Sequence, residues 1–473
     1  MLEAPPPQGG IGMTAEIAIL NKTAVALAAD SAVTISAGRK EEKIFDSADK
    51  LFELSNHNPI GIMIYNGMSF MEAPLPSLIR QFRTICPRVH NVEDAANKFL
   101  LFLNEFGERS PEIVKQASVK SIVSQVLTDI MERFNKKLQN RFFSLGKEAR
   151  HVEDYQPIFE EILDTEINLY LHVFRSCENA SFVGSDRPVS ITRSKSDLLK
   201  RLIAEQMPIA SQAQAKKLLE ITKLSLRKNI LSRGRTGIVV AGFGDRELFP
   251  TLFSFELDGM VCDRLKYVKT NCVDIDRQGT KAKVLPFAQK EMVERFLYGL
   301  DDKIQKEVTK FCQITIPDIR NGIINEISFE NEGDKAEIGN KAQEAESAFL
   351  SGLKEKAFEK IRDQSQAEIE DMVEFMPKPE LAKMAEALVN LTSIKRRVSR
   401  GVETVGGPID VAVISQAEGF VWVKRKHYFP PDLNSRYFER VRAGGTMRQG
   451  ENGDGKAPKP RSSNTRTRAK TEA

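Results

Sequence analysis

The sequence "GMTAEIAILNKTAVALAADSAVTI", residues 12–35, contains two short apolar runs separated by a polar step. The alternation in the first run predicts a half-buried strand, with Ala15 facing outward and Ile17 and Ile19 facing inward. The second run, residues 24–29, is apolar throughout and predicts a strand that is packed on both faces. The stretch therefore predicts an antiparallel hairpin near the start of the chain.

The register of this hairpin brings a hydroxyl and a carboxylate to one edge of the sheet. If Asn21 and Lys22 form a two-residue loop, Thr14 lies opposite Ala29. Asp30 is then the neighbour of Thr14 at that edge. An ordinary hairpin with a polar edge has the same pattern, so the hairpin by itself leaves both a structural and a functional interpretation open.

Composition places the chain among globular proteins. It has 473 residues, of which 41% are hydrophobic and 28% charged, enough for one large or two to three ordinary domains. The formal net charge of +4 is small and indicates no particular partner. No apolar run approaches the roughly 20 residues of a membrane span, and "MLEAPPPQGGIGM" lacks the features of a secretory signal.

Cysteine and histidine usage bears on redox compartment and cofactors. The five cysteines are scattered, odd in number and without a CxxC motif, which predicts reduced thiols in a cytoplasmic protein. Neither the cysteines nor the five histidines cluster at metal-ligand spacing. The sequence therefore predicts neither a metal nor another cofactor.

A second hairpin is predicted where "KLFELS" and "PIGIMIYNG" flank the turn sequence "NHNP". Folding the chain at residues 56–59 brings Lys50 close to the turn that contains Gly67. A lysine and a glycine turn then share one edge, as Thr14 and Asp30 do in the first hairpin.

The remaining elements alternate in blocks. Residues 69–233 have a helical pattern, which is clearest in the apolar stripe formed by Ile122, Val123, Val126, Leu127, Ile130, Met131 and Phe134. Strands are predicted at 236–244 and 251–259, and a helix is predicted to begin at Pro286, because proline favours the first helical position. Charged helices follow within 340–398, and the final strands are "PIDVAVIS" and "GFVWVKR". Such runs of like elements predict an α+β fold.

Five motifs in this order resemble the proteasome β-subunit family: "AADSAVTI", the lysine that opens "KLFEL", "YNG", "GIVVAGF" and "GGPIDVAVI". The nearer-looking relatives are the bacterial peptidases of the HslV and Anbu type. The resemblance covers about half of the chain. It implies an N-terminal-nucleophile (Ntn) hydrolase with a four-layer αββα sandwich, in which two sheets lie between helices.

The resemblance also implies a domain organisation. Residues 14–104 and 234–440 would form the proteasome-like domain, and 105–233 would be an inserted helical region that is longer than the family needs. The tail at 441–473 is basic with almost no apolar residues, which predicts disorder.

The family's catalytic residues fall on matching positions of this sequence. The resemblance implies that Thr14 is the nucleophile, Asp30 and Lys50 complete the catalytic trio, and the backbone N–H of Gly67 stabilises the oxyanion. Lys43, in the polar stretch "GRKEEKIF", is an alternative to Lys50.

These residue types suit the chemistry. A threonine hydroxyl needs a base to take its proton, and the α-amino group of the same residue can do so, since its reference pKa is about 7.7–8.0. A lysine ammonium nearby lowers the pKa of the hydroxyl, and an aspartate keeps the lysine charged. Glu403 and Thr404 correspond to a supporting acid and hydroxyl of the family, although the expected Asp-x-x-Ser-Gly pattern is absent. Alternatively, these two residues only end a helix.

This mechanism requires Thr14 to be the first residue of the mature chain. Residues 1–13 would therefore be a leader or a propeptide. Either the chain cleaves itself between Met13 and Thr14, or translation starts at Met13 and an aminopeptidase removes this methionine. We favour the second route, because such enzymes remove methionine before small residues.

The resemblance predicts a cytoplasmic threonine peptidase that cleaves polypeptides and assembles into a homo-oligomeric ring or spiral. By analogy an ATP-dependent unfoldase would be its partner, whereas no membrane partner is expected. Binding of nucleic acid is not expected either, because no aromatic residues alternate with the basic residues of the tail. Two alternatives remain: a small-molecule amidase of the same fold, and a non-enzymatic assembly or binding protein in which Thr14 is never exposed.

Overall fold

The computed structural model describes residues 14–37, 41–145, 156–184, 189–329, 331–398 and 406–439. The chain divides into two compact units, Met1–Lys426 and His427–Ala473.

The first sheet has five antiparallel strands in the order β13-β1-β2-β14-β15. Its strands are β1 (Ala15–Asn21), β2 (Val25–Ala29), β13 (Ala282–Ala288), β14 (Asp410–Ser415) and β15 (Gly419–Lys424). The hairpin from the start of the chain is therefore enclosed by strands from much later in the sequence.

The second sheet has six strands in the order β5-β6-β10-β11-β12-β9, also antiparallel. Its strands are β5 (Leu51–Glu53), β6 (Ile60–Asn66), β9 (Ser181–Phe182), β10 (Thr236–Gly242), β11 (Thr251–Val261) and β12 (Arg264–Asp274). Two short ladders accompany the sheets: β3 (Val33–Ala37) with β4 (Glu41–Phe45), and β7 (Ser69–Phe70) with β8 (Ala73–Pro74).

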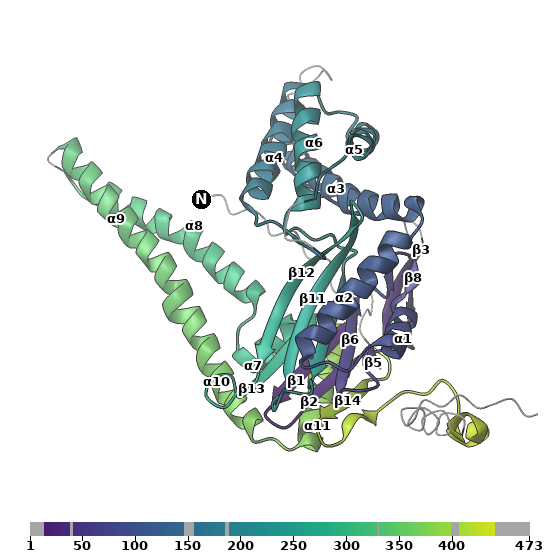
Figure 1. Ribbon diagram of the computed structural model, residues 1–473. Helices are drawn as coiled ribbons and strands as arrows, with labels where there is room; N and C mark the ends of the chain where they lie inside the picture. The colour runs from purple at the N-terminus through teal and green to yellow at the C-terminus, as the bar shows by residue number, and fades with distance from the viewer. Residues whose placement is uncertain are drawn as a thin grey trace, which may run out of the picture. The chain divides into compact units, whose positions relative to one another are not determined.

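The two sheets share one core, in which Leu27 of β2 belongs to the same buried cluster as Met63 of β6 and Val239 of β10. Helices cover the other face of each sheet. The helices on the first sheet are α7 (Glu291–Tyr298), α10 (Lys360–Glu374) and α11 (Lys378–Arg397). The helices on the second sheet are α1 (Leu75–Ile85) and α2 (Val92–Arg109) (Figure 1). The predicted α+β class with antiparallel sheets is confirmed.

Four helices between α2 and β10 build a separate core. They are α3 (Glu112–Leu145), α4 (Gln156–Ser176), α5 (Arg193–Gln206) and α6 (Gln212–Arg227). The apolar stripe predicted for residues 122–134 lies in α3 and packs into this core, as its spacing predicts. Lys266 of β12 connects α6 to the second sheet, because its buried ammonium donates to Ser225 O and pairs with Asp258 at 2.9 Å.

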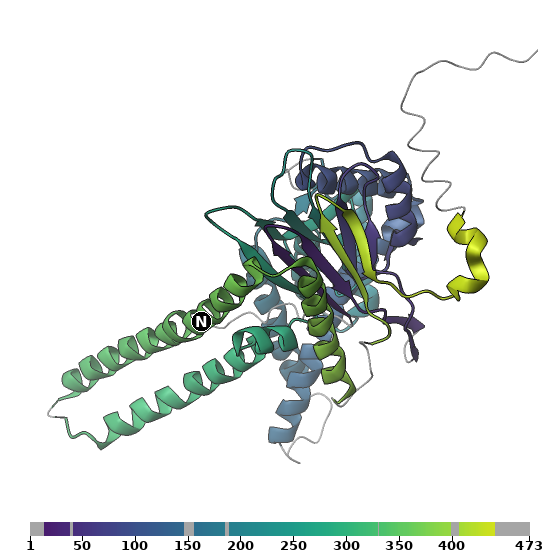
Figure 2. The same ribbon diagram turned by 90° about the horizontal axis from the view of Figure 1, so that it is seen from below.

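The chain between α7 and α10 forms α8 (Asp302–Glu326), α9 (Glu332–Gly352) and a π-helical segment at Leu353–Glu359. Helices α8 and α9 lie side by side in both views (Figures 1 and 2) and are joined by the Arg320–Glu346 ion pair at 2.6 Å. None of the residues of α8 is buried. No helix in the described part of the chain combines the length and apolarity needed to cross a lipid bilayer.

The second unit is described up to residue 439. It contains a short 3₁₀ helix at Pro431–Asn434. Several of its aromatic rings contact one another, with Phe429 5.2 Å from Tyr437 between ring centroids.

The structure corrects the first hairpin in two respects. Strand β1 is buried on both faces, so Ala15 does not face outward; the second sheet covers one face and helices cover the other. The loop residues are Lys22 and Thr23, because Asn21 N donates to Ala24 O at 3.1 Å and the Asn21 side chain accepts from Thr23 N at 2.9 Å. The register moves by two residues, so that Glu16 rather than Thr14 lies opposite Ala29.

The second hairpin has a loop of five residues, one more than predicted. Leu54 N donates to Ile60 O at 2.9 Å, and the Ser55 hydroxyl accepts from the backbone N–H of Asn58 inside the loop. Lys50 is therefore next to Ile64 across the ladder, with Ile64 N donating to Lys50 O at 2.9 Å.

Pro286 does not begin a helix. It lies in β13 opposite Ile17 of β1, and α7 begins at Glu291. Strand β13 is an edge strand with β1 as its partner, and proline is tolerated at a sheet edge because one side of the strand needs no ladder hydrogen bonds.

Candidate active site

The ends of four strands carry the residues that the sequence selected. Thr14 precedes β1, Asp30 follows β2, Lys50 precedes β5 and Gly67 follows β6. The strands stop where apolar residues give way to polar ones, and the facing of the two sheets brings together the three strand ends at Thr14, Asp30 and Lys50.

The centre of the site is a buried ion pair. Lys50 Nζ lies 2.5 Å from Asp30 Oδ1 and 3.2 Å from Glu16 Oε1, and the Lys50 side chain is 1% exposed. A lysine is stable at such depth only when it is paired and hydrogen-bonded. Lys43 lies in β4, where its backbone is paired with Ile35 of β3. The structure thus places Lys50 against Asp30.

Glu16 is a member of this cluster that the sequence analysis missed. Thr14 Oγ donates to Glu16 Oε2 at 3.1 Å, and the Glu16 side chain is fully buried. Residues two apart on a strand share a face, so the register of β1 places Glu16 and Thr14 together. The available signal was a single carboxylate within an otherwise apolar strand, two residues after Thr14.

Asp30 is held by two backbone donors in addition to Lys50. Ala15 N donates to Asp30 Oδ1 at 3.3 Å, and Gly406 N donates to Asp30 Oδ2 at 3.1 Å. Gly406 belongs to the "GGPID" segment, so this segment fixes the orientation of the carboxylate. Glu403 and Thr404, predicted as supporting residues, lie outside the described residues.

The cluster contains two carboxyl groups, Glu16 and Asp30, but one lysine, so the charges do not cancel when both carboxyl groups are ionised. Burial raises the pKa of Glu16 to about 7; Lys50 opposes this change and Asp30 adds to it. Burial also raises the pKa of Asp30, against the opposing effect of Lys50 and of the N–H donors of Gly406 and Ala15. A single lysine therefore serves two buried carboxyl groups.

Gly67 lies at the turn after β6, beside β10. A Cβ atom at this position would lie 2.1 Å from the Thr236 hydroxyl oxygen, so the packing itself requires glycine. Among the described residues no hydrogen bond joins Gly67 to Thr14, Asp30 or Lys50. The structure therefore places Gly67 directly after β6, where packing against Thr236 requires glycine.

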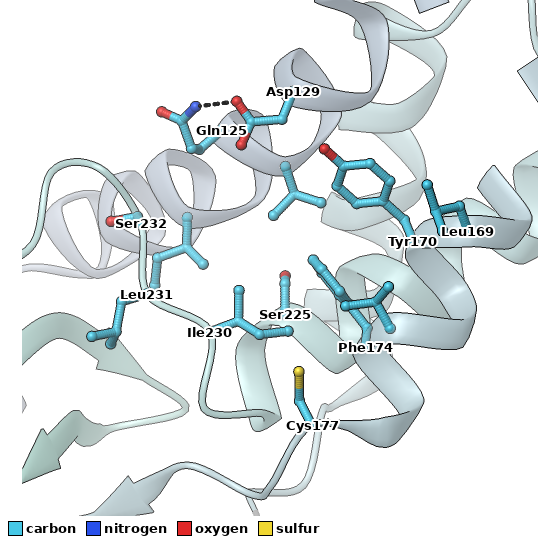
Figure 3. A pocket seen from close by; sticks show the side chains of 13 residues that line it. Gln125, Asp129, Leu169, Tyr170, Phe174, Cys177, Ser225, Ile230, Leu231 and Ser232 are labelled. Atoms are coloured by element: carbon cyan, nitrogen blue, oxygen red, sulfur yellow. Dashed lines mark hydrogen bonds between the residues drawn. The ribbon is translucent and has the colours of Figure 1, made fainter. Parts of the chain in front are cut away.

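The helical core of α3–α6 contains a small cavity of about 50 Å³ (Figure 3). Figure 3 shows Gln125 donating to Asp129 at one end, near the Tyr170 hydroxyl, and Cys177 at the other. Ligand pockets usually measure about 300–1,000 Å³, whereas one water occupies about 30 Å³. This cavity is too small for a substrate.

Within the described residues, no group of three or more histidine, cysteine, aspartate or glutamate side chains could hold a metal ion. All five cysteines are free thiols. No protein-family model matches the chain, and no curated protein matches it. Its function is therefore inferred from the geometry of the site together with the sequence motifs.

Proposed function

We propose that the chain is a threonine-type N-terminal-nucleophile hydrolase that cleaves peptide bonds with Thr14. The observation that carries the proposal is the buried Lys50–Asp30 ion pair, which Glu16 links to the Thr14 hydroxyl. Two facing sheets with helices on both outer faces fit the four-layer sandwich of the proteasome-like Ntn hydrolases.

Each residue has a separate role in this proposal. The Thr14 hydroxyl attacks the carbonyl carbon of the substrate. The Lys50 ammonium stabilises the negative charge that develops on the threonine oxygen as its proton leaves. Asp30 holds Lys50 in place and is itself fixed by the Gly406 N–H. The Gly67 N–H stabilises the oxyanion of the tetrahedral intermediate.

The sequence resemblance extends the proposal to substrate and assembly. It supports polypeptide substrates, a homo-oligomeric ring or spiral and an ATP-dependent unfoldase as a partner. The free cysteines agree with a reducing compartment, which supports a cytoplasmic location.

One observation favours the non-enzymatic alternative. Thr14 is only 3% exposed in the full chain. A peptidase must expose this hydroxyl to its substrate, whereas a binding or assembly protein that retains the fold need not. The state of the N-terminus therefore decides between the two functions.

The first experiment determines the intact mass and N-terminal sequence of the protein expressed from its own gene. We expect a chain that begins at Thr14 and hydrolyses fluorogenic peptides. Thr14→Ala should abolish hydrolysis, whereas Thr165→Ala, on the exposed surface of α4, should leave it unchanged. A chain that retains Met13, or a Thr14→Ala variant with full activity, would refute the proposal. Cleavage of small amides but not of peptides would favour the amidase alternative.

A further inference from the structure

We propose that the Glu16 carboxylate is the base that takes the proton from the Thr14 hydroxyl. This inference rests on the proposed function, since it assigns the proton acceptor of the same reaction. It adds a catalytic residue to the trio that the sequence motifs indicate.

The hydrogen bonds of Glu16 are arranged for this role. Its Oε2 accepts from Thr14 Oγ at 3.1 Å, and its Oε1 pairs with Lys50 Nζ at 3.2 Å. A general base must lie within about 2.6–3.2 Å of the heavy atom whose proton it takes, and Glu16 meets this requirement. The ion pair with Lys50 leaves the second oxygen directed at the hydroxyl.

Titratable groups lie near Glu16 after the neighbouring strand β2 and on the facing sheet. Lys50 lies beside β5 and Asp30 follows β2, while Tyr65 of β6 is close enough for its phenol to be affected by the Glu16 charge. Burial raises the pKa of Glu16 to about 7. A base with a pKa near the working pH is the most effective, because it is ionised and still accepts a proton readily.

Asp30 does not compete for this proton. Its oxygens accept from Lys50 Nζ, Ala15 N and Gly406 N, so its donors are already in place and none of them is the Thr14 hydroxyl. The two carboxyl groups thus have different tasks: Asp30 orients Lys50, and Glu16 exchanges a proton with Thr14.

The proton moves through a closed cycle. As Thr14 Oγ bonds to the carbonyl carbon of the substrate, its proton passes to Glu16, which returns it to the leaving amine nitrogen as the C–N bond breaks. Water then adds to the resulting ester and gives a proton to Glu16. This proton returns to Thr14 Oγ as the ester bond breaks, and the enzyme is regenerated.

Glu16→Gln is the decisive variant, since the glutamine oxygen still accepts from Lys50 but the side chain cannot take a proton. We expect kcat to fall by about 10²–10⁴, the usual contribution of general acid–base catalysis, with little change in KM. Glu16→Asp should restore part of the activity. Activity of Glu16→Gln within threefold of wild type, with the same pH profile, would overturn the inference.

The wild-type enzyme provides a second measurement that does not depend on the folding of a variant. We expect kcat/KM to rise with pH around a midpoint near 7, and this midpoint should hardly change with temperature, as for a carboxyl group. A midpoint that falls clearly on warming identifies an amine as the base and overturns the inference.

A third measurement separates this inference from the proposed function. A peptide vinyl sulfone should modify Thr14 of the wild type, as seen by mass spectrometry, if Thr14 is a reactive nucleophile. Labelled Thr14 together with an unimpaired Glu16→Gln variant refutes the role of Glu16 alone. Absence of labelling and of hydrolysis refutes both.

Discussion

The buried Glu16 carboxyl makes the stability of the protein depend on pH in a defined direction. Its pKa is 4.5 as an ordinary glutamate and about 7 in the folded chain, chiefly because of burial. Between these pH values the folded state retains the proton and the unfolded state releases it. The contribution of Glu16 to stability is therefore fully present below pH 4.5 and is lost as the pH rises through about 7.

The size of this effect follows from the two pKa values. A difference of one pH unit between them corresponds to about 1.4 kcal/mol, so the change from 4.5 to about 7 corresponds to about 3 kcal/mol. Glu16→Gln removes the titrating group and keeps the shape of the side chain. Relative to wild type, the variant should therefore gain about 3 kcal/mol in free energy of unfolding between pH 4.5 and pH 8.

Urea unfolding at several pH values measures this difference. Trp422, the one tryptophan of the sequence, lies in β15 of the first sheet and reports unfolding by its fluorescence. Glu344→Gln, at an exposed position of α9, serves as the matched control and should follow the wild-type pH dependence. A difference between Glu16→Gln and wild type that does not vary with pH would refute the reasoning.

Three further predictions concern the same part of the fold. Lys50→Met leaves two buried carboxyl groups without their lysine and should lower the free energy of unfolding by about 3–5 kcal/mol. The control Lys378→Met removes an exposed pair with a glutamate and should lower it by less than about 1 kcal/mol. Equal losses for the two variants in urea unfolding would contradict this prediction. Gly67→Ala should lower the melting temperature and the peptidase activity, because the new Cβ atom would lie 2.1 Å from the Thr236 hydroxyl oxygen. Adding Thr236→Ala should recover the melting temperature. If the double variant shows no recovery, this contact is not the cause of the loss. Asn21→Ala removes the side-chain acceptor of the β1–β2 turn and the two hydrogen bonds that this side chain donates at the end of α10. It should lower the free energy of unfolding by about 1–3 kcal/mol in urea unfolding. An unchanged urea midpoint would show that the turn does not need these hydrogen bonds.

The strand ends could be predicted from sequence because they depend on local patterns. Apolar runs bounded by polar residues located β1, β2, β5 and β6, and so placed Thr14, Asp30 and Lys50 at one edge of the structure. An error of one or two residues in register did not separate them, because each lies directly beside its strand.

Other features depend on tertiary contacts that no local pattern contains. Pro286 has the same local preference at a helix start and at a sheet edge, and only the position of β13 beside β1 decides between them. Burial of both faces of β1 requires a second sheet and helices from later in the chain. Glu16 was missed because a lone carboxylate in an apolar strand does not by itself indicate its partner, and this partner, Lys50, is 34 residues away.

The bond between Gly406 N and Asp30 Oδ2 joins positions 376 residues apart in the sequence. Strand β2 likewise has β14 as its second neighbour, so the first sheet closes only when the last part of the chain has been made. During synthesis on the ribosome, Thr14 and Asp30 emerge first but wait for almost the whole chain before the carboxylate is fixed. A hydrolase built in this order would have no oriented Asp30 carboxylate until residues 406–415 have been made, so it could not cleave its own nascent chain before that point.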